Sequence, residues 1–223
     1  MKLILGGGGD ENTSIQSHKR FFDLLKNSRK VLYIPIAILS DKYTPEGCLS
    51  WFSGAFKNMG DLDIEMVTRF EDIDSDLGKY AGIYIGGGNT YKLLHEMKKS
   101  GIDERLDTYK GVVYGGSAGA IIFGKDISTA EHADINNVGL KDISGLNYLK
   151  GYNLWCHYKE EDIPLIDRLV EKGQKIISIE EDSAIYINNT HIIQSIGNNV
   201  RIHIQGKDTF KLLPKEQFEL LPR

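Results

Sequence analysis

The stretch VVYGGSAGAII, from Val112 to Ile122, changes character in its middle. Its first three residues suit a buried β-strand, the residues from Gly115 to Gly119 are small, and the apolar residues after them suit a helix. Gly-x-Ser-x-Gly, with Ser117 at its centre, is the pattern of a nucleophile elbow, a sharp turn from strand to helix that presents a serine. The glycines are needed because side chains two positions from the corner would collide. The alternative is a structural turn without chemistry.

Short apolar runs alternate with amphipathic stretches before this turn. Runs rich in Val, Ile and Tyr predict strands at 2–5, 30–36, 63–68, 81–85 and 111–114, and amphipathic stretches predict helices at 14–28, 47–59 and 89–100. Strands that alternate with helices are typical of βαβ units and a parallel sheet covered on both faces. We therefore expect an α/β fold with three layers, in which helices lie on both faces of a mostly parallel central sheet.

The regular alternation of predicted strands and helices ends at about Asp126. A polar excursion at 126–137 is followed by a predicted strand at 152–158, a helix at 160–173, and strands at 175–181, 184–189, 191–196 and 200–206. The C-terminal part therefore adds β-strands to the alternating fold. Because the sequence contains no repeat, low-complexity segment or linker, we predict one domain over residues 1–223.

Composition excludes several classes of function. A net charge of −4 without a cluster of Lys and Arg gives no reason to expect a nucleic-acid partner. No stretch reaches the roughly 20 apolar residues that span a bilayer, and the apolar run at 3–5 is too short for a signal-peptide core, so we expect a cytoplasmic protein without a membrane partner. Cys48 and Cys156 are predicted to be free thiols, and no ligand spacing indicates a metal or another cofactor.

Two further glycine-rich turns follow predicted strands, GGGGDENT at 6–13 and GGGNT at 86–90. In open parallel sheets, ligands bind beyond the carboxyl ends of the strands, where these turns are expected. Glu11 and Tyr91 occupy the position of the third glycine in a dinucleotide fingerprint, and neither turn has the Gly-Lys-Ser/Thr ending of a phosphate loop. A nucleotide-binding fold with degenerate loops is the alternative.

A nucleophilic serine needs a base, usually histidine. His18 and His95 belong to amphipathic helices and are expected on the surface, whereas His191 and His203 belong to strands and are expected to be structural; His132 and His157 remain. His157 is the better candidate because it ends a predicted strand on the side where the elbow should open.

The base needs an acidic partner that fixes its tautomer. Asp134 in the polar excursion is one candidate, and the others are Glu180, Glu181 and Asp182, which follow the apolar residues KIISI at 175–179. The residues alone do not separate them.

Four segments together resemble the peptidase E family of serine peptidases. They are YIGGGNTYKLL at 84–94, GGSAGA at 115–120, the strand-borne His157, and IEEDSA at 179–184. The family includes the α-aspartyl dipeptidases and, more distantly, the cyanophycinases. The resemblance covers most of the chain and implies a fold similar to that of class I glutamine amidotransferases, with serine in place of the elbow cysteine.

The resemblance also implies roles for individual residues. Ser117 corresponds to the nucleophile and His157 to the general base, and the amides of Gly88 and Ala118 correspond to the oxyanion hole. The third member is Glu181 by likeness to cyanophycinases or Asp134 by likeness to aspartyl dipeptidases, with Glu181 favoured. The substrate-binding positions that the resemblance implies are Gly87, Asn89, Gly116 and Arg168.

The chain departs from the aspartyl dipeptidases after the histidine. Those enzymes carry a segment whose arginine is expected to bind the substrate's aspartate, and this chain has HYKEEDIPLIDR at 157–168 instead. Arg168 is the nearest basic residue, but it lies on a predicted helix next to Asp167, where a surface position is expected. The resemblance therefore implies a serine hydrolase without fixing aspartate specificity.

The sequence as a whole predicts a cytoplasmic serine peptidase that cleaves small, dipeptide-like substrates through an acyl-enzyme on Ser117. The alternatives are an esterase with the same triad and a non-catalytic binding protein on this fold. The sequence determines neither the natural substrate nor the oligomeric state. The candidate assembly is a homodimer.

Overall fold

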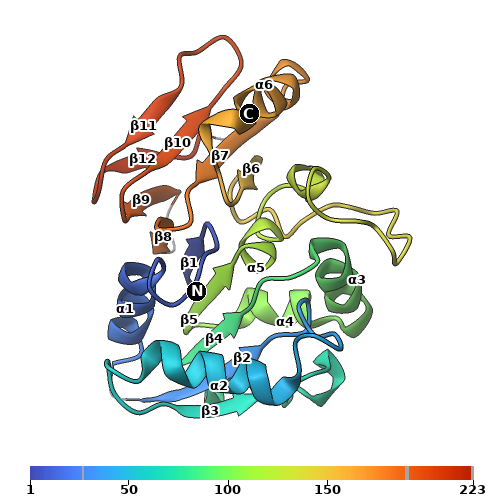
Figure 1. Cartoon of the computed structure of the whole chain (residues 1–223), viewed down its shortest axis with the longest axis vertical. Coiled ribbons are helices and arrows are strands. Elements are labelled where there is room, and N and C mark those ends of the chain that lie inside the picture. The colour runs from blue at the N-terminus through green and yellow to red at the C-terminus, as the bar shows by residue number, and fades with distance from the viewer. Residues whose placement is uncertain (27, 189–190, 222–223) are drawn as a thin grey trace.

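The computed structural model describes residues 1–26, 28–188 and 191–221, whose strands and helices are drawn in Figure 1. In chain order the strands are β1 (Lys2–Gly6), β2 (Lys30–Ile34), β3 (Asp63–Met66), β4 (Gly82–Ile85), β5 (Val112–Gly116), β6 (Tyr152–Trp155), β7 (Lys175–Ile179), β8 (Ala184–Asn188), β9 (Ile192–Ile196), β10 (Val200–His203), β11 (Phe210–Leu212) and β12 (Gln217–Glu219). The helices are α1 (Ile15–Leu24), α2 (Pro45–Phe56), α3 (Thr90–Ser100), α4 (Ile102–Thr108), α5 (Ala118–Ile121) and α6 (Ile163–Glu171). Short 3-10 helices lie at Phe70–Asp72, Leu77–Lys79, Ser128–Ala130 and Glu160–Asp162.

The described strands form two sheets. The larger sheet has eight strands in the order β12-β9-β8-β1-β5-β4-β2-β3; its last five members run parallel, and β8, β9 and β12 are antiparallel to their neighbours. The smaller sheet has the order β11-β10-β7-β6, with only β6 and β7 parallel to each other. In Figure 1 the smaller sheet and α6 lie above the parallel strands.

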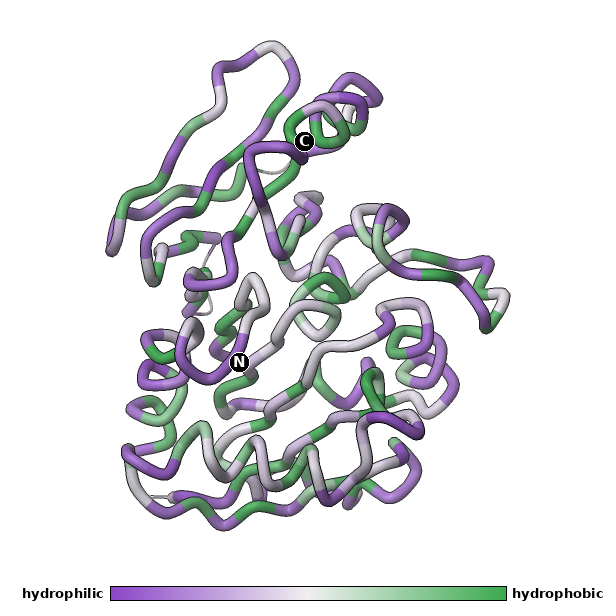
Figure 2. Tube along the Cα trace, in the orientation of Figure 1, coloured by the Kyte–Doolittle hydropathy of each residue, from purple (hydrophilic) through white to green (hydrophobic). Residues whose placement is uncertain are grey.

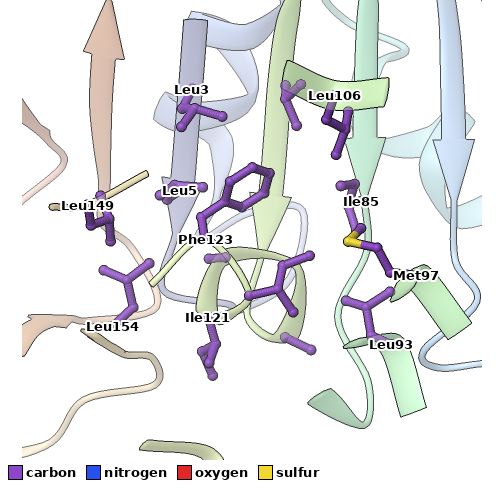
Figure 3. Packing of buried hydrophobic residues seen from close by; sticks show 14 of the residues in the cluster. Leu3, Leu5, Ile85, Leu93, Met97, Leu106, Ile121, Phe123, Leu149 and Leu154 are labelled. Carbon is purple, nitrogen blue, oxygen red and sulfur yellow. The ribbon is translucent and has the colours of Figure 1, made fainter. Parts of the chain in front are cut away.

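Alternate residues of the parallel strands bury opposite faces of the large sheet. On one face, Leu3, Leu5 and Ile85 join a cluster with Leu93 and other residues of α3, α4 and α5. Figure 3 shows side chains of this cluster pointing toward one another between the strands and the helices. The period of two follows from strand geometry, in which successive side chains point to opposite faces.

The other face is rich in aromatic residues. Tyr33, Tyr84 and Tyr114 of the strands pack with phenylalanines of α1 and α2, among them Phe21 and Phe52. Figure 2 shows hydrophobic segments following the strands of the molecule, while the outer loops are mainly hydrophilic. The expected three layers, a mostly parallel sheet between helices, are confirmed.

Most predicted elements are present, and three were missed. The five early strands, the three early helices and the C-terminal strands occur near their predicted positions, whereas α4, β11 and β12 were not predicted. Asn27, within the predicted helix 14–28, and Asn189, the last residue of the predicted strand 184–189, lie outside the described residues. Both cysteines are free and buried, and no helix in the described ranges is long and apolar enough to cross a bilayer.

Candidate active site

The three glycine-rich turns meet at one edge of the large sheet. In the parallel register, Gly6 at the end of β1 lies opposite Gly116, and Ile85 at the end of β4 lies opposite Gly115. The segments after β1, β4 and β5 therefore leave the sheet side by side, as expected for the carboxyl ends of parallel strands. Ser117 is the residue at which β5 turns into α5.

Ser117 has a strained backbone conformation. Its φ of 51° lies in the region that non-glycine residues rarely adopt. A side chain could not be accommodated at Gly115 or Gly119, the glycines two positions from Ser117. A Cβ at Gly115 would lie 2.2 Å from the Gly119 carbonyl oxygen, and one at Gly119 would lie 2.3 Å from that of Ile85. The predicted steric reason for Gly-x-Ser-x-Gly is thus present in the turn, which holds the serine side chain at the sheet edge.

His157 follows β6 and contacts Ser117. Its Nε2 lies 2.8 Å from Ser117 Oγ, and its backbone amide donates to the Gly7 carbonyl at 2.7 Å. Its φ of 54° is also in the left-handed region. Gly8 lies against the imidazole so closely that a Cβ there would be 2.1 Å from Cε1. The turn after β1 therefore fixes both the backbone and the ring of this histidine.

Glu181, in the turn between β7 and β8, contacts the other ring nitrogen. Its Oε1 lies 2.8 Å from His157 Nδ1. The two side chains are 45% and 49% exposed, so their attraction is screened by solvent, and the hydrogen bond acts mainly on the orientation of the ring. Ser117, His157 and Glu181 form one continuous hydrogen-bonded chain.

Asp134, the other acid that the sequence left open, does not contact His157. Its Oδ2 accepts a hydrogen bond from the Thr90 amide at 2.7 Å, in the first turn of α3. His132 is likewise engaged elsewhere, because its ring stacks on Trp155 with centroids 4.1 Å apart. The polar excursion thus contacts the N-terminus of α3 through Asp134 and contacts Trp155 of β6 through His132.

Most of the chain matches a known family of peptidases. Residues 3–196 match the family model of peptidase family S51. The chain belongs to this family. As an S51 peptidase it is a hydrolase of the serine type, and the resemblance to peptidase E is confirmed.

Relatives with most of their length in common support the assignment. An uncharacterized peptidase of Pasteurella multocida is 30% identical over 196 residues, which cover 78% of this chain and 90% of that protein. Peptidase E of Shewanella denitrificans is 27% identical over 224 residues, which cover 92% of this chain and 91% of that protein. A crystal structure of a protein assigned to peptidase E from Listeria monocytogenes has a TM-score of 0.63 and 23% identity, covers 95% of this chain and 98% of its own, and shows that the fold is shared.

The glycine-rich turn after β4 lies beside Ser117. Gly87 lies against Ser117, since a Cβ there would be 3.3 Å from the serine Cβ. Within residues 1–26, 28–188 and 191–221, we find no protein acceptor for the amide of Gly88 or of Ala118. Gly87, Gly88 and Gly116 all line the cavity that contains Ser117 and His157.

Two predicted substrate-binding residues lie elsewhere. Asn89 caps α3, with its Oδ1 accepting from the Lys92 amide at 2.9 Å, and it does not line the cavity. Arg168 is exposed on α6 and also lies outside the cavity lining. The expected surface position of Arg168 is therefore observed.

A buried thiol lies directly behind the serine. Cys156 Sγ is 3.7 Å from the carbonyl oxygens of Gly6 and Ser117, and burial raises the pKa of this thiol to about 12. A thiol with such a pKa stays protonated and is a poor nucleophile at neutral pH. Of this pair, Ser117 is therefore the candidate nucleophile.

The cavity beside the serine has a volume of about 620 Å³ and an aromatic wall that the sequence did not predict. Tyr33, Trp51, Tyr84 and Tyr114 line it together with Ile38. The tyrosines lie in runs that predict strands, and the tryptophan lies in a stretch that predicts an amphipathic helix. No local signal distinguishes a core tyrosine from one that also borders a cavity.

Proposed function

We propose that this S51 peptidase hydrolyses small peptides through an acyl-enzyme on Ser117. The observation that carries the proposal is the 2.8 Å contact between Ser117 Oγ and His157 Nε2, at a strained turn that opens into a cavity. A general base must be within hydrogen-bond reach of the proton that it abstracts, and this one is. A cavity of about 620 Å³ is in the range that suits small ligands.

Glu181 determines which form of the imidazole serves as the base. In the tautomer with the proton on Nδ1, the Nδ1–H group donates a hydrogen bond to the Glu181 carboxylate. Nε2 then has a free lone pair that accepts the hydrogen bond from the serine hydroxyl. As Ser117 Oγ bonds to the peptide carbonyl carbon, Nε2 takes the serine proton. The carboxylate stabilises the imidazolium that results.

The amides of Gly88 and Ala118 are the donors for the oxyanion in this proposal. They belong to two turns that converge on the serine, and donors aimed at developing charge each contribute about a hundredfold or more in rate. Collapse of the tetrahedral intermediate breaks the C–N bond, and His157 returns its proton to the leaving amine. A water molecule, deprotonated by the same histidine, then hydrolyses the acyl-enzyme and restores Ser117.

Labelling with a fluorophosphonate tests the proposal directly. We expect one phosphonyl adduct, located by mass spectrometry on Ser117, and the loss of peptide hydrolysis in proportion to labelling. Ser117→Ala should lower kcat at least about 10⁴-fold, while Ser100→Ala at the end of α3 serves as the matched control and should keep wild-type activity. The absence of an adduct on Ser117 in folded protein would refute the mechanism.

Two other expectations from the sequence stay predictions. The cytoplasmic location and the homodimer both accompany the proposed activity without being required by it. Dipeptide length of the substrate belongs to the proposal and is tested by comparing dipeptides with longer peptides of the same sequence.

A further inference from the structure

The wall of the cavity beside Ser117 is built by side chains from four elements. Tyr33 comes from β2, Trp51 from α2, Tyr84 from β4 and Tyr114 from β5, and all of them line the same space as Ser117. The rings of Tyr84 and Tyr114 stack with centroids 4.4 Å apart, and both side chains are buried in the packed face of the sheet. The wall is therefore held in place before a ligand arrives.

The polar atoms of three of these four residues have protein partners. Trp51 Nε1 donates to Glu11 Oε2 at 3.0 Å, Tyr84 Oη lies 3.0 Å from His18 Nε2, and Tyr114 Oη lies 3.0 Å from Ser17 Oγ. Because these groups are already hydrogen-bonded, what the three rings offer a ligand is mainly their apolar surface. Such surface favours an apolar group that leaves water.

Among the described residues that line the cavity, the carboxylate and ammonium groups are those of Asp10 and Lys42, and both residues are exposed. Lys42, the one Lys or Arg among the described residues that line the cavity, is exposed, and its Nζ lies 5.2 Å from the ring centroid of Tyr43. Asp10 is also exposed, and its Oδ1 accepts from the amides of Asn12 and Thr13. A substrate carboxylate set against the rings would lose water without gaining a cationic partner there, which is unfavourable.

We propose that this cavity binds a large apolar side chain, aromatic or branched aliphatic, of the peptide substrate. The inference rests on the proposed function, since it assigns the side chain that accompanies the scissile bond to Ser117. It makes the aromatic wall the specificity element of the enzyme and gives Trp51 a substrate contact. Aspartate is then a poor residue at this subsite.

Dipeptides with Phe, Leu, Ala, Asp or Lys at one position and Ala at the other test the inference. We expect that, at one of the two positions, Phe or Leu gives a kcat/KM about 10 to 100 times that of Ala, with Asp below Ala. A preference for Asp at both positions, or no dependence on the side chain at either, would overturn the inference. If Asp is preferred in the wild type and Lys42→Met abolishes that preference, the lysine rather than the aromatic wall selects the side chain. This result would also overturn the inference.

Two glycines of α2 provide a matched pair of variants. Gly47 lines the cavity, and a Cβ there would have only Thr44 Oγ1 nearby, at 3.5 Å. Gly54 lies on the same helix outside the lining, and a Cβ there would meet nothing within 4 Å. Gly47→Leu should lower the ratio of kcat/KM for Phe to that for Ala at least about tenfold, and Gly54→Leu should leave this ratio unchanged. Equal ratios in the two variants would count against the assigned cavity.

Binding to Ser117→Ala separates this inference from the proposed function. Affinities of the same dipeptides, measured by calorimetry, should be at least about tenfold higher for Phe or Leu than for Asp at the preferred position. This ranking requires no turnover, so it decides the inference even if the fluorophosphonate leaves Ser117 unlabelled. If Ser117 is labelled but Asp binds best, the catalytic proposal stands and the inference fails.

Discussion

Ser117 and His157 share an unusual feature, a φ angle in the left-handed region. For a residue with a Cβ this conformation costs on the order of 1–2 kcal/mol, and it persists only where neighbouring structure holds it. Both backbones are held by the same short segment, because the amide of Ser117 donates to Gly6 and that of His157 donates to Gly7. The end of β1 therefore sets the separation of the two side chains that meet at 2.8 Å.

The contact between Glu181 and His157 predicts which acid matters for activity. Glu181→Gln keeps the size of the side chain, but its amide can donate to Nδ1 and so no longer fixes the tautomer in which Nε2 accepts from Ser117. We therefore expect kcat for peptide hydrolysis to fall about a hundredfold or more. Asp134→Asn, whose parent carboxylate accepts from Thr90, should keep kcat and lower the unfolding free energy by about 0.5–2 kcal/mol. Steady-state kinetics and chemical denaturation measure the two effects. An equal loss of kcat in both variants would contradict the assignment.

At the scale of elements, α1 differs from its prediction at one position. The amphipathic pattern predicts His18 on the surface, yet its side chain is fully buried. The imidazole lies among the rings of Phe56, Tyr84 and Tyr114, with Nε2 3.0 Å from the Tyr84 hydroxyl. Within the described part of the chain, Nδ1 is buried without a hydrogen-bond partner. Protonation would place an unpaired donor there, so the neutral form is favoured.

Burial of His18 predicts a pH dependence of stability. Burial lowers its pKa from 6.5 to about 4, with nearby Glu11 opposing the shift. Between these values the unfolded chain binds a proton that the folded chain does not, so stability is lost as pH falls below about 6.5 and the loss levels off near pH 4. From pH 7 to pH 4.5, wild type should lose about 2 kcal/mol more unfolding free energy than His18→Gln, which cannot titrate. Denaturant titrations at several pH values measure this difference, and parallel profiles would show that His18 is not responsible.

The elements that the sequence predicts well are those whose signal is local. The strands β1 to β5 are apolar runs that end at Gly, Pro or polar residues, and each can be recognised without its neighbours. β11 and β12 have three residues each, and their extended form depends on pairing with β10 and β9. A segment of three residues is too short to show an alternating sequence pattern, so its pairing with a distant strand cannot be recognised from its own residues.

The same distinction applies to the site. The proximity of Ser117 and His157 could be expected because the pattern around each lies within a few residues of a strand end. Glu181 could not be separated from Asp134, since the choice depends on how the turn after β7 lies against β1. The aromatic wall joins residues that are distant in sequence, so the folded chain is needed to find it.

At the scale of the whole molecule, the two sheets depend on each other. One hydrophobic cluster contains Leu5 and Val113 of the large sheet together with Leu154, Ile177 and Ile202 of the small one. In Figure 3, Leu149 and Leu154 lie beside Leu5 and Phe123 in this cluster. A core shared in this way favours joint folding of the two sheets.

The candidate site crosses the same boundary. Ser117 follows β5 of the large sheet, whereas His157 and Glu181 follow β6 and β7 of the small one. The hydrogen-bonded chain between the three side chains therefore requires the sheets to be packed together. Loss of that packing would separate Ser117 from His157 even if β5 and β6 kept their structure.

The two tryptophans allow this dependence to be tested, because Trp51 lies on α2 over the large sheet and Trp155 lies in β6 of the small one. If residues 1–223 are one domain, as the sequence predicts, fluorescence of the single-tryptophan variants Trp155→Phe and Trp51→Phe should each report a transition that coincides with that of far-UV circular dichroism. Adding Leu154→Ala, which removes a fully buried side chain of the shared core, should lower stability by about 2–5 kcal/mol and move both fluorescence transitions together. A shift confined to the Trp155 signal would instead show that the small sheet unfolds independently and that the site can be dismantled while the large sheet stays folded.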